Sequence, residues 1–147
     1  MALPPQKFRE IVLQVLFSRD FIPGFEEEMI PFMMNELKVT KRIMLDVHAR
    51  VDSVLANLDS IDAEIRTAST EYSFERISRV ERTILRLGLF ELHFDTALPA
   101  KVVIAEAIRL CRKFGTPESA SYINAILDGV YKKNGSSAPT PEPALAQ

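Results

Sequence analysis

The stretch SRVERTILRLGLFELHF, Ser78–Phe94, decides how this chain folds. Ser78 and Glu81 have the spacing of a capping box, in which a serine caps a helix and the glutamate three residues on bonds back to it. The apolar residues that follow at helical spacing are Ile84, Leu85, Leu89 and Leu92. The stretch therefore predicts an amphipathic helix with one buried face.

The same helical period recurs on both sides of this stretch. The chain has only five glycines and no convincing alternating pattern, which favours an all-α fold of about seven helices. We expect a single helical domain over residues 1–133, with an N-terminal subdomain at about 1–70 and a C-terminal subdomain at about 71–133. Residues 134–147 hold three prolines and no packable pattern, so they are predicted to be a disordered tail.

Composition excludes several classes of protein. Hydrophobic residues make up 47% of the 147 residues and charged residues 26%, which is typical of a globular chain with a buried core. No apolar run approaches the roughly 20 residues needed to span a bilayer, and the N-terminus has no signal-peptide pattern. The single cysteine, Cys111, excludes an internal disulfide and fits a reducing cytoplasm.

Charge is distributed unevenly along the chain. Residues 1–74 carry 8 Lys/Arg against 12 Asp/Glu, whereas residues 75–113 carry 8 against 5. A locally basic part can bind phosphate groups even in a chain whose net charge is −2. The alternative is that these charges form an ordinary solvated helix face.

The sequence shows no pattern of catalytic chemistry. It has no glycine-rich phosphate loop, and His48 and His93 lack metal-ligand spacing around them. Cys111 falls on an apolar helix face, as a small core residue does. No nucleophile, base and oxyanion site come together, so we expect a binding protein with no cofactor or metal, and not an enzyme.

A second stretch, RKFGTPESASYINAILDGV at 112–130, reads as a helix end followed at once by a helix start. Gly115 is expected to close the first helix in the left-handed conformation, with Thr116 as the cap of the next helix and Pro117 in its first turn. Polar side chains then crowd around one aromatic ring, Tyr122. The turn is either a ligand surface or a well-capped helix start in which Tyr122 packs half-buried beside Ile123.

Two blocks of the sequence resemble the signatures of the NusB family. ERISRVERTILRLGLFEL at 75–92 is similar to the first signature, and residues 99–130 are similar to the second, which begins Pro-x-Lys-Val. The positions of the second block that match in register are Lys101, Glu106, Gly115, Ser119, Asn124 and Asp128. The segment FREIVLQVLF near the N-terminus matches the family's first helix more loosely.

The resemblance implies a fold of two helical subdomains packed at a large angle. It also implies a cytoplasmic transcription antitermination factor that binds the boxA element of ribosomal RNA transcripts together with the ribosomal protein NusE. The pair would join the RNA polymerase elongation complex. Some family members self-associate, so a homodimer is a further expectation. The alternative function is protein–protein contact or ribosome assembly with weak RNA binding.

The resemblance also assigns roles to individual residues. Tyr122 matches a phenylalanine that is positioned against an RNA base, and Glu81 matches a glutamate that faces the protein partner. The residues expected to bind RNA are Lys7, Arg9, Lys101, Arg112, Lys113, Glu118 and Tyr122. The residues expected to bind the partner are Glu75, Glu81 and Arg82. Glu81 can complete the capping box and also contact the protein partner if one of its carboxylate oxygens points outward.

The chain departs from the family pattern in ways that reduce its basic and polar surface. Many members begin with an arginine-rich segment, whereas this N-terminus offers only Lys7 and Arg9. Ala105 and Ala125 stand where asparagine and glycine are frequent, and Ser121 where lysine is frequent. Because fewer cationic side chains neutralise fewer phosphates, we expect weaker RNA binding and greater reliance on the partner.

Overall fold

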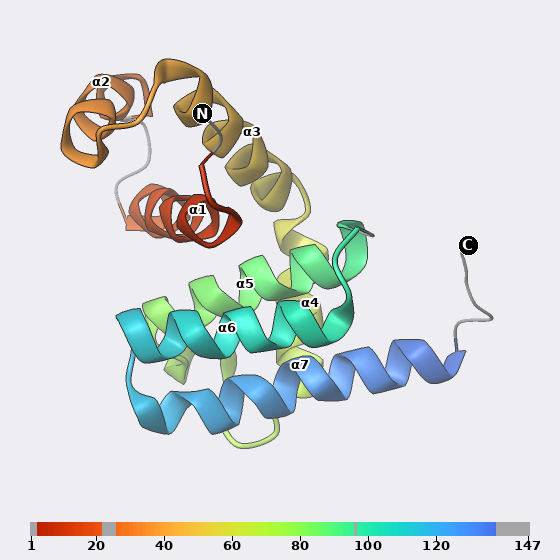
Figure 1. The fold of residues 1–147 in the computed structure, drawn as a ribbon. Helices are drawn as coiled ribbons and strands as arrows, with labels where there is room; N and C mark the ends of the chain where they lie inside the picture. Colours follow the sequence, from red (N-terminus) through yellow and green to blue (C-terminus); the bar gives the residue numbers. More distant parts are fainter. Residues whose placement is uncertain (1–2, 22–25, 96, 138–147) are drawn as a thin grey trace. The chain divides into compact units, whose positions relative to one another are not determined.

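The computed structural model describes residues 3–21, 26–95 and 97–137, and within them the fold is all-helical (Figure 1). The elements in chain order are α1 (Pro5–Phe21), α2 (Glu26–Leu37), α3 (Lys41–Ala56), α4 (Leu58–Ala68), η1 (Phe74–Arg76), α5 (Arg79–Phe94), α6 (Ala100–Phe114) and α7 (Pro117–Ser137). Seven α-helices and one short 3₁₀ helix, with no strand among these residues, confirm the predicted fold class. No helix in this described part of the chain is long and apolar enough to cross a membrane.

The chain separates into two compact units, Met1–Leu58 and Asp59–Gln147. This division puts nearly all of α4 in the C-terminal unit, whereas the predicted N-terminal subdomain extends to about residue 70. The physical reason is a side-chain link that periodicity does not reveal. Asp62 of α4 accepts two hydrogen bonds from Arg86 of α5, each 2.9 Å long, and this link ties the two helices together.

In the N-terminal unit, α3 packs against both α1 and α2. The buried apolar residues of α1 and α3 are Ile11, Val12, Leu13, Val15, Leu16, Met44, Val47, Val51 and Val54. Thr40 caps α3 by accepting a hydrogen bond from the Ile43 amide at 3.2 Å. Lys38, directly after α2, has a φ of 55°, the left-handed conformation that often ends a helix.

In the C-terminal unit, α5, α6 and α7 pack against one another (Figure 1). The buried apolar residues of these three helices include Ile84, Leu85, Leu87, Leu89, Val103, Leu110, Cys111, Ile123, Ile126 and Leu127. Gly88 lets α5 and α7 approach closely, because a Cβ at this position would lie 3.2 Å from a methyl carbon of Leu127.

The junction between α6 and α7 differs from the sequence expectation at Gly115. Its φ of −110° is not left-handed. Glycine is needed here for room, because a Cβ at this position would lie 3.0 Å from the Cys111 carbonyl oxygen. That same carbonyl accepts a 2.8 Å hydrogen bond from the Gly115 amide, which ends α6.

The last helix runs further than the sequence suggests. α7 continues to Ser137, past Tyr131 where its apolar pattern ends and into the segment expected to be a tail. An ion pair between Lys132 and Asp128, with N···O at 2.9 Å and i,i+4 spacing, spans the turn that contains Tyr131. The remaining residues of the expected tail, 138–147, lie outside the described residues.

Candidate functional site

The capping box at the start of α5 is present as predicted. The Glu81 amide donates to Ser78 Oγ at 3.2 Å, and the Ser78 amide donates to Glu81 Oε1 at 3.3 Å. These two bonds satisfy amides that the helix itself leaves unpaired. They also fix the direction in which the Glu81 side chain points.

The second carboxylate oxygen of Glu81 links α5 to the start of α7. Ser119 Oγ donates to Glu81 Oε2, and Thr116 Oγ1 lies 2.8 Å from Ser119 Oγ. Because Ser119 gives its only hydroxyl proton to the carboxylate, Thr116 is the donor to Ser119. Both carboxylate oxygens of Glu81 therefore bond within the protein, and neither is the free outward oxygen that the partner role assumes.

The other two expected partner residues lie close to the Phe74 ring. Phe74 is buried, and the guanidinium carbons of Arg66 and Arg82 lie 4.1 Å and 5.0 Å from its centroid. Arg82 is half-buried and packs on this ring, whereas Glu75 is exposed and pairs with Arg66 at 3.7 Å. Glu75 is thus the most accessible of the three expected partner residues.

Tyr122 lies half-buried beside a hollow of about 420 Å³ in the C-terminal unit. Its hydroxyl lies 2.6 Å from Ser69 Oγ, and its ring packs edge-to-face against Tyr72 with centroids 5.2 Å apart. Burial raises the pKa of the Tyr122 hydroxyl above its ordinary value; the Ser69 hydrogen bond lowers this pKa, and the nearby Glu81 and Glu71 carboxylates raise it.

The rim of this hollow is polar and acidic. Its polar lining, apart from the two tyrosines, consists of Ser69, Thr70, Glu71, Glu118 and Ser121. Glu118 and Tyr122 are among the residues expected to bind RNA, whereas Tyr72, in the connector between α4 and η1, was not among them. The available signal was an aromatic residue inside a polar connector, where no core position explains it.

The three expected basic residues of the C-terminal unit do not all lie at the α6–α7 turn. Lys101 lies in the first turn of α6, and Arg112 and Lys113 lie in its last turn. At 1.5 Å per residue, the two ends are roughly 17 Å apart along the helix axis, so Lys101 does not flank this turn. In the N-terminal unit, Lys7 is exposed, but Arg9 is only 8% exposed and is poorly placed to reach a phosphate.

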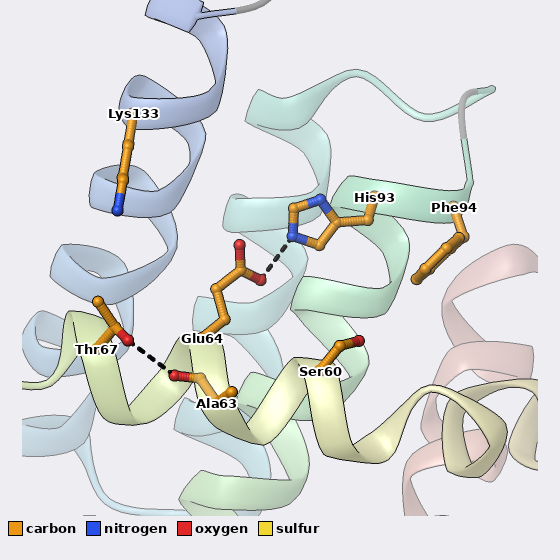
Figure 2. Close-up of a pocket in the computed structure, with 7 residues that line it drawn as sticks. All are labelled: Ser60, Ala63, Glu64, Thr67, His93, Phe94 and Lys133. Carbon is orange, nitrogen blue, oxygen red and sulfur yellow. Dashed lines mark hydrogen bonds and ion pairs between the residues drawn. The ribbon is translucent and has the colours of Figure 1, made fainter.

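A second hollow, of about 490 Å³, lies between α4, the end of α5 and α7 (Figure 2). At its centre, His93 Nε2 and Glu64 Oε1 are 2.6 Å apart, so His93 is paired with a carboxylate. Phe94 and Lys133 border the same space. Across residues 3–21, 26–95 and 97–137, no group of three His, Cys, Asp or Glu side chains is arranged to hold a metal ion.

Cys111 behaves as a core residue. It is fully buried, and its thiol donates to the Thr116 carbonyl with Sγ···O at 3.3 Å. Burial, with the nearby Glu81 carboxylate, raises the pKa of the thiol above its ordinary value of 9.0. Because the thiolate is the reactive form, this environment disfavours nucleophilic chemistry.

Comparison with known proteins decides the family. A profile described as the NusB family matches residues 6–132. The chain belongs to the NusB family. The transcription antitermination protein NusB of Chlamydia pneumoniae is 35% identical over 128 residues, which cover 87% of this chain and 80% of that protein. The NusB of Geobacter sulfurreducens is 37% identical over 125 residues, which cover 83% and 89% of the two chains.

Solved NusB structures share the fold. The structure of T. maritima NusB aligns with a TM-score of 0.76 and 30% identity, over 90% of this chain and 94% of that one. A complex of the antitermination factors NusB and NusE with double-stranded RNA aligns with a TM-score of 0.74 and 24% identity, over 87% and 96% of the chains. The NusB family consists of transcription antitermination factors that are not enzymes, and this chain is one of them.

Proposed function

We propose that this NusB chain binds a boxA-type single-stranded RNA together with a NusE ribosomal protein, and that the pair acts in the cytoplasm on the RNA polymerase elongation complex. A homodimer stays a prediction. The observation that carries the RNA part is the hollow beside Tyr122, where aromatic rings and hydrogen-bonding groups meet in one open space. Single-stranded RNA is commonly recognised by such groups, which stack on bases and bond to their edges.

Family likeness supports the choice of partners. Relatives at 35% and 37% identity are transcription antitermination proteins. The same fold occurs in the complex of NusB with NusE and double-stranded RNA. Exposed Arg112 and Lys113 at the end of α6 supply positive charge for phosphate contacts, which position RNA without reading its sequence.

One observation favours the second candidate, a protein-contact or ribosome-assembly role with weak RNA binding. The rim of the hollow carries two exposed carboxylates, Glu71 and Glu118, and both repel phosphate. Arg9, one of only two basic residues before residue 19, is buried. The two candidates differ in how strongly the chain retards a boxA RNA when its NusE partner is present.

The test measures retardation of a boxA RNA and of a shuffled RNA of equal composition, with and without NusE, over a series of salt concentrations. We expect binding to boxA to need NusE and to weaken with salt. In the double variant Arg112→Gln/Lys113→Gln, the slope of log affinity against log salt should become less steep. We expect its magnitude to fall by about 0.7 for each phosphate that the variant no longer neutralises.

A matched control removes two neighbouring exposed charges elsewhere. Lys41→Gln with Arg42→Gln changes the net charge equally in the N-terminal unit and should leave the salt slope unchanged. If the wild-type pair forms but retards boxA and shuffled RNA alike, the protein-contact role is the better description.

A further inference from the structure

The connector after α4 is tied to α7 by a chain of two hydrogen bonds. Ser69 Oγ donates to the Tyr72 carbonyl oxygen at 2.6 Å, and the Tyr122 hydroxyl lies 2.6 Å from the same Ser69 Oγ. A serine hydroxyl has only one proton to give, and here the carbonyl takes it. The Tyr122 hydroxyl is therefore the donor to Ser69, and its proton is used inside the protein.

The two tyrosines of the hollow differ in how much of their side chain is exposed to a ligand. Tyr122 is half-buried and held by Ser69, whereas Tyr72 is 51% exposed. Their rings meet edge-to-face at an interplanar angle of 72°, an arrangement that aromatic pairs prefer. Of the two rings, Tyr72 offers more surface to a ligand, and Tyr122 holds it in place.

The charge of the rim indicates which part of an RNA chain can enter. Glu71 and Glu118 line the hollow beside the two tyrosines. Carboxylates repel phosphate groups but accept hydrogen bonds from the amino groups of bases. An uncharged, flat base therefore suits the hollow better than a phosphate does.

We propose that Tyr72 is the residue on which an RNA base stacks in this hollow, and that Tyr122 is a positioning residue that acts on Tyr72 through Ser69. This assignment rests on the proposed RNA-binding function and refines it. It differs from the role that the family resemblance implies for Tyr122, whose ring is expected to lie against the base.

The first test compares boxA affinity of the chain with NusE for a set of variants whose folding is checked by circular dichroism. Tyr72→Leu removes the aromatic face and should lower affinity about 5- to 150-fold. Tyr72→Phe keeps the face and should retain affinity. Tyr131→Leu is the matched control, because Tyr131 is also half exposed but lies outside the hollow, and it should bind as the wild type does.

A double-mutant cycle tests the positioning role. Tyr122→Phe deletes only the hydroxyl and should lower affinity about two- to tenfold by releasing the connector. In the Tyr72→Leu background, the same change should have no further effect, because there is no ring left to position. Additive losses would overturn the positioning role.

Tyrosine fluorescence identifies the stacked ring directly, because the chain has three tyrosines and no tryptophan. The variant Tyr122→Phe/Tyr131→Phe keeps only Tyr72, and the variant Tyr72→Phe/Tyr131→Phe keeps only Tyr122. Emission from NusE is common to both complexes and cancels in the comparison. We expect boxA to quench the tyrosine fluorescence of the variant that keeps only Tyr72. The fluorescence of the variant that keeps only Tyr122 should stay nearly unchanged.

The outcomes separate this assignment from the function on which it rests. If RNA binds the wild type but quenches only the chain with Tyr122, or if Tyr72→Leu binds as tightly as the wild type, the assignment is wrong and the RNA-binding function stands. If the wild-type pair binds no RNA at all, both fall.

Discussion

The two compact units differ in how far the ion pairs between their helices are enclosed. In the N-terminal unit, Arg19 of α1 pairs with Asp52 of α3 at 2.6 Å, with side chains 18% and 63% exposed, and the Arg42–Asp46 pair within α3 lies in solvent, at 84% and 53%. In the C-terminal unit, the Arg86–Asp62 pair is enclosed, at 9% and 13%. The comparison teaches that both units link helices by an ion pair, but the unit that carries the hollow encloses both members of its pair, whereas the other unit leaves the carboxylate of its pair exposed.

The largest expected effect comes from breaking the enclosed pair. Asp62→Ala leaves the Arg86 guanidinium without its two-bond partner, which costs about 3–5 kcal/mol in comparable buried pairs. We expect a loss of this size in the free energy of unfolding, measured by urea denaturation. Asp46→Ala, the matched exposed pair, should change it by less than about 1 kcal/mol. Equal losses of stability in Asp62→Ala and Asp46→Ala would contradict the view that the enclosed pair contributes more than the exposed pair.

The link between the starts of α5 and α7 should come next. Glu81→Ala removes a capping bond and the acceptor for Ser119, and we expect a loss of about 1–2 kcal/mol. Glu81→Gln keeps an acceptor oxygen for the cap and should cost less. The same denaturation assay measures both, and a glutamine variant as unstable as the alanine variant would show that the charge of Glu81, not its cap, matters.

The N-terminal unit should respond to a backbone change. Lys38 adopts a φ of 55°, which costs a residue with a Cβ about 1–2 kcal/mol. Lys38→Gly should therefore raise the free energy of unfolding, by about 0.5–1 kcal/mol after the added freedom of the unfolded chain is counted. Lys38→Ala is the control and should bring no gain, because alanine keeps the Cβ.

The smallest effect is expected from alkaline pH. The pKa values of Cys111 and Tyr122 are both raised in the folded state, mainly by burial, from ordinary values of 9.0 and 10.0. The folded state then holds protons that the unfolded state has released, so stability is fully present below pH 9 and falls as pH rises beyond it. Tyr122→Phe should flatten the fall above pH 10 in denaturation curves taken at pH 8 to 11. If the free energy of unfolding falls with pH equally steeply in Tyr122→Phe and in the wild type, Tyr122 does not contribute to this pH dependence.

Local patterns in the sequence predicted the elements well. The capping box at Ser78 and Glu81 follows from spacing along the chain, and the structure confirms it. Of the predicted apolar stripe of α5, Ile84, Leu85 and Leu89 are buried and Leu92 is half-buried. Burial also runs without a break from Thr83 to Glu91, so α5 is enclosed on more than the one face that the pattern predicted. The helical period predicted the all-helical class, and family likeness predicted the NusB fold, which the solved relatives share. These features depend on neighbours a few residues away or on a shared ancestry.

Links across long sequence separations were not predictable in the same way. The hydrogen bonds of Asp62 with Arg86 and of Ser69 with Tyr122 join residues that are 24 and 53 positions apart. Helical periodicity therefore does not predict that they pair. Lys101 and Arg112 were both expected to bind RNA near the start of α7, yet they lie at opposite ends of α6. Which of the charged groups contact RNA or NusE stays a prediction.

The buried thiol of Cys111 gives this protein a built-in reporter. It is the only cysteine in the chain, and it is fully buried where α6 gives way to α7. An alkylating reagent can reach it only when that junction opens, so the rate of labelling reports the free energy of local opening without any added probe. Ligands that close the α6–α7 junction would slow this reaction, which turns a structural residue into a binding assay.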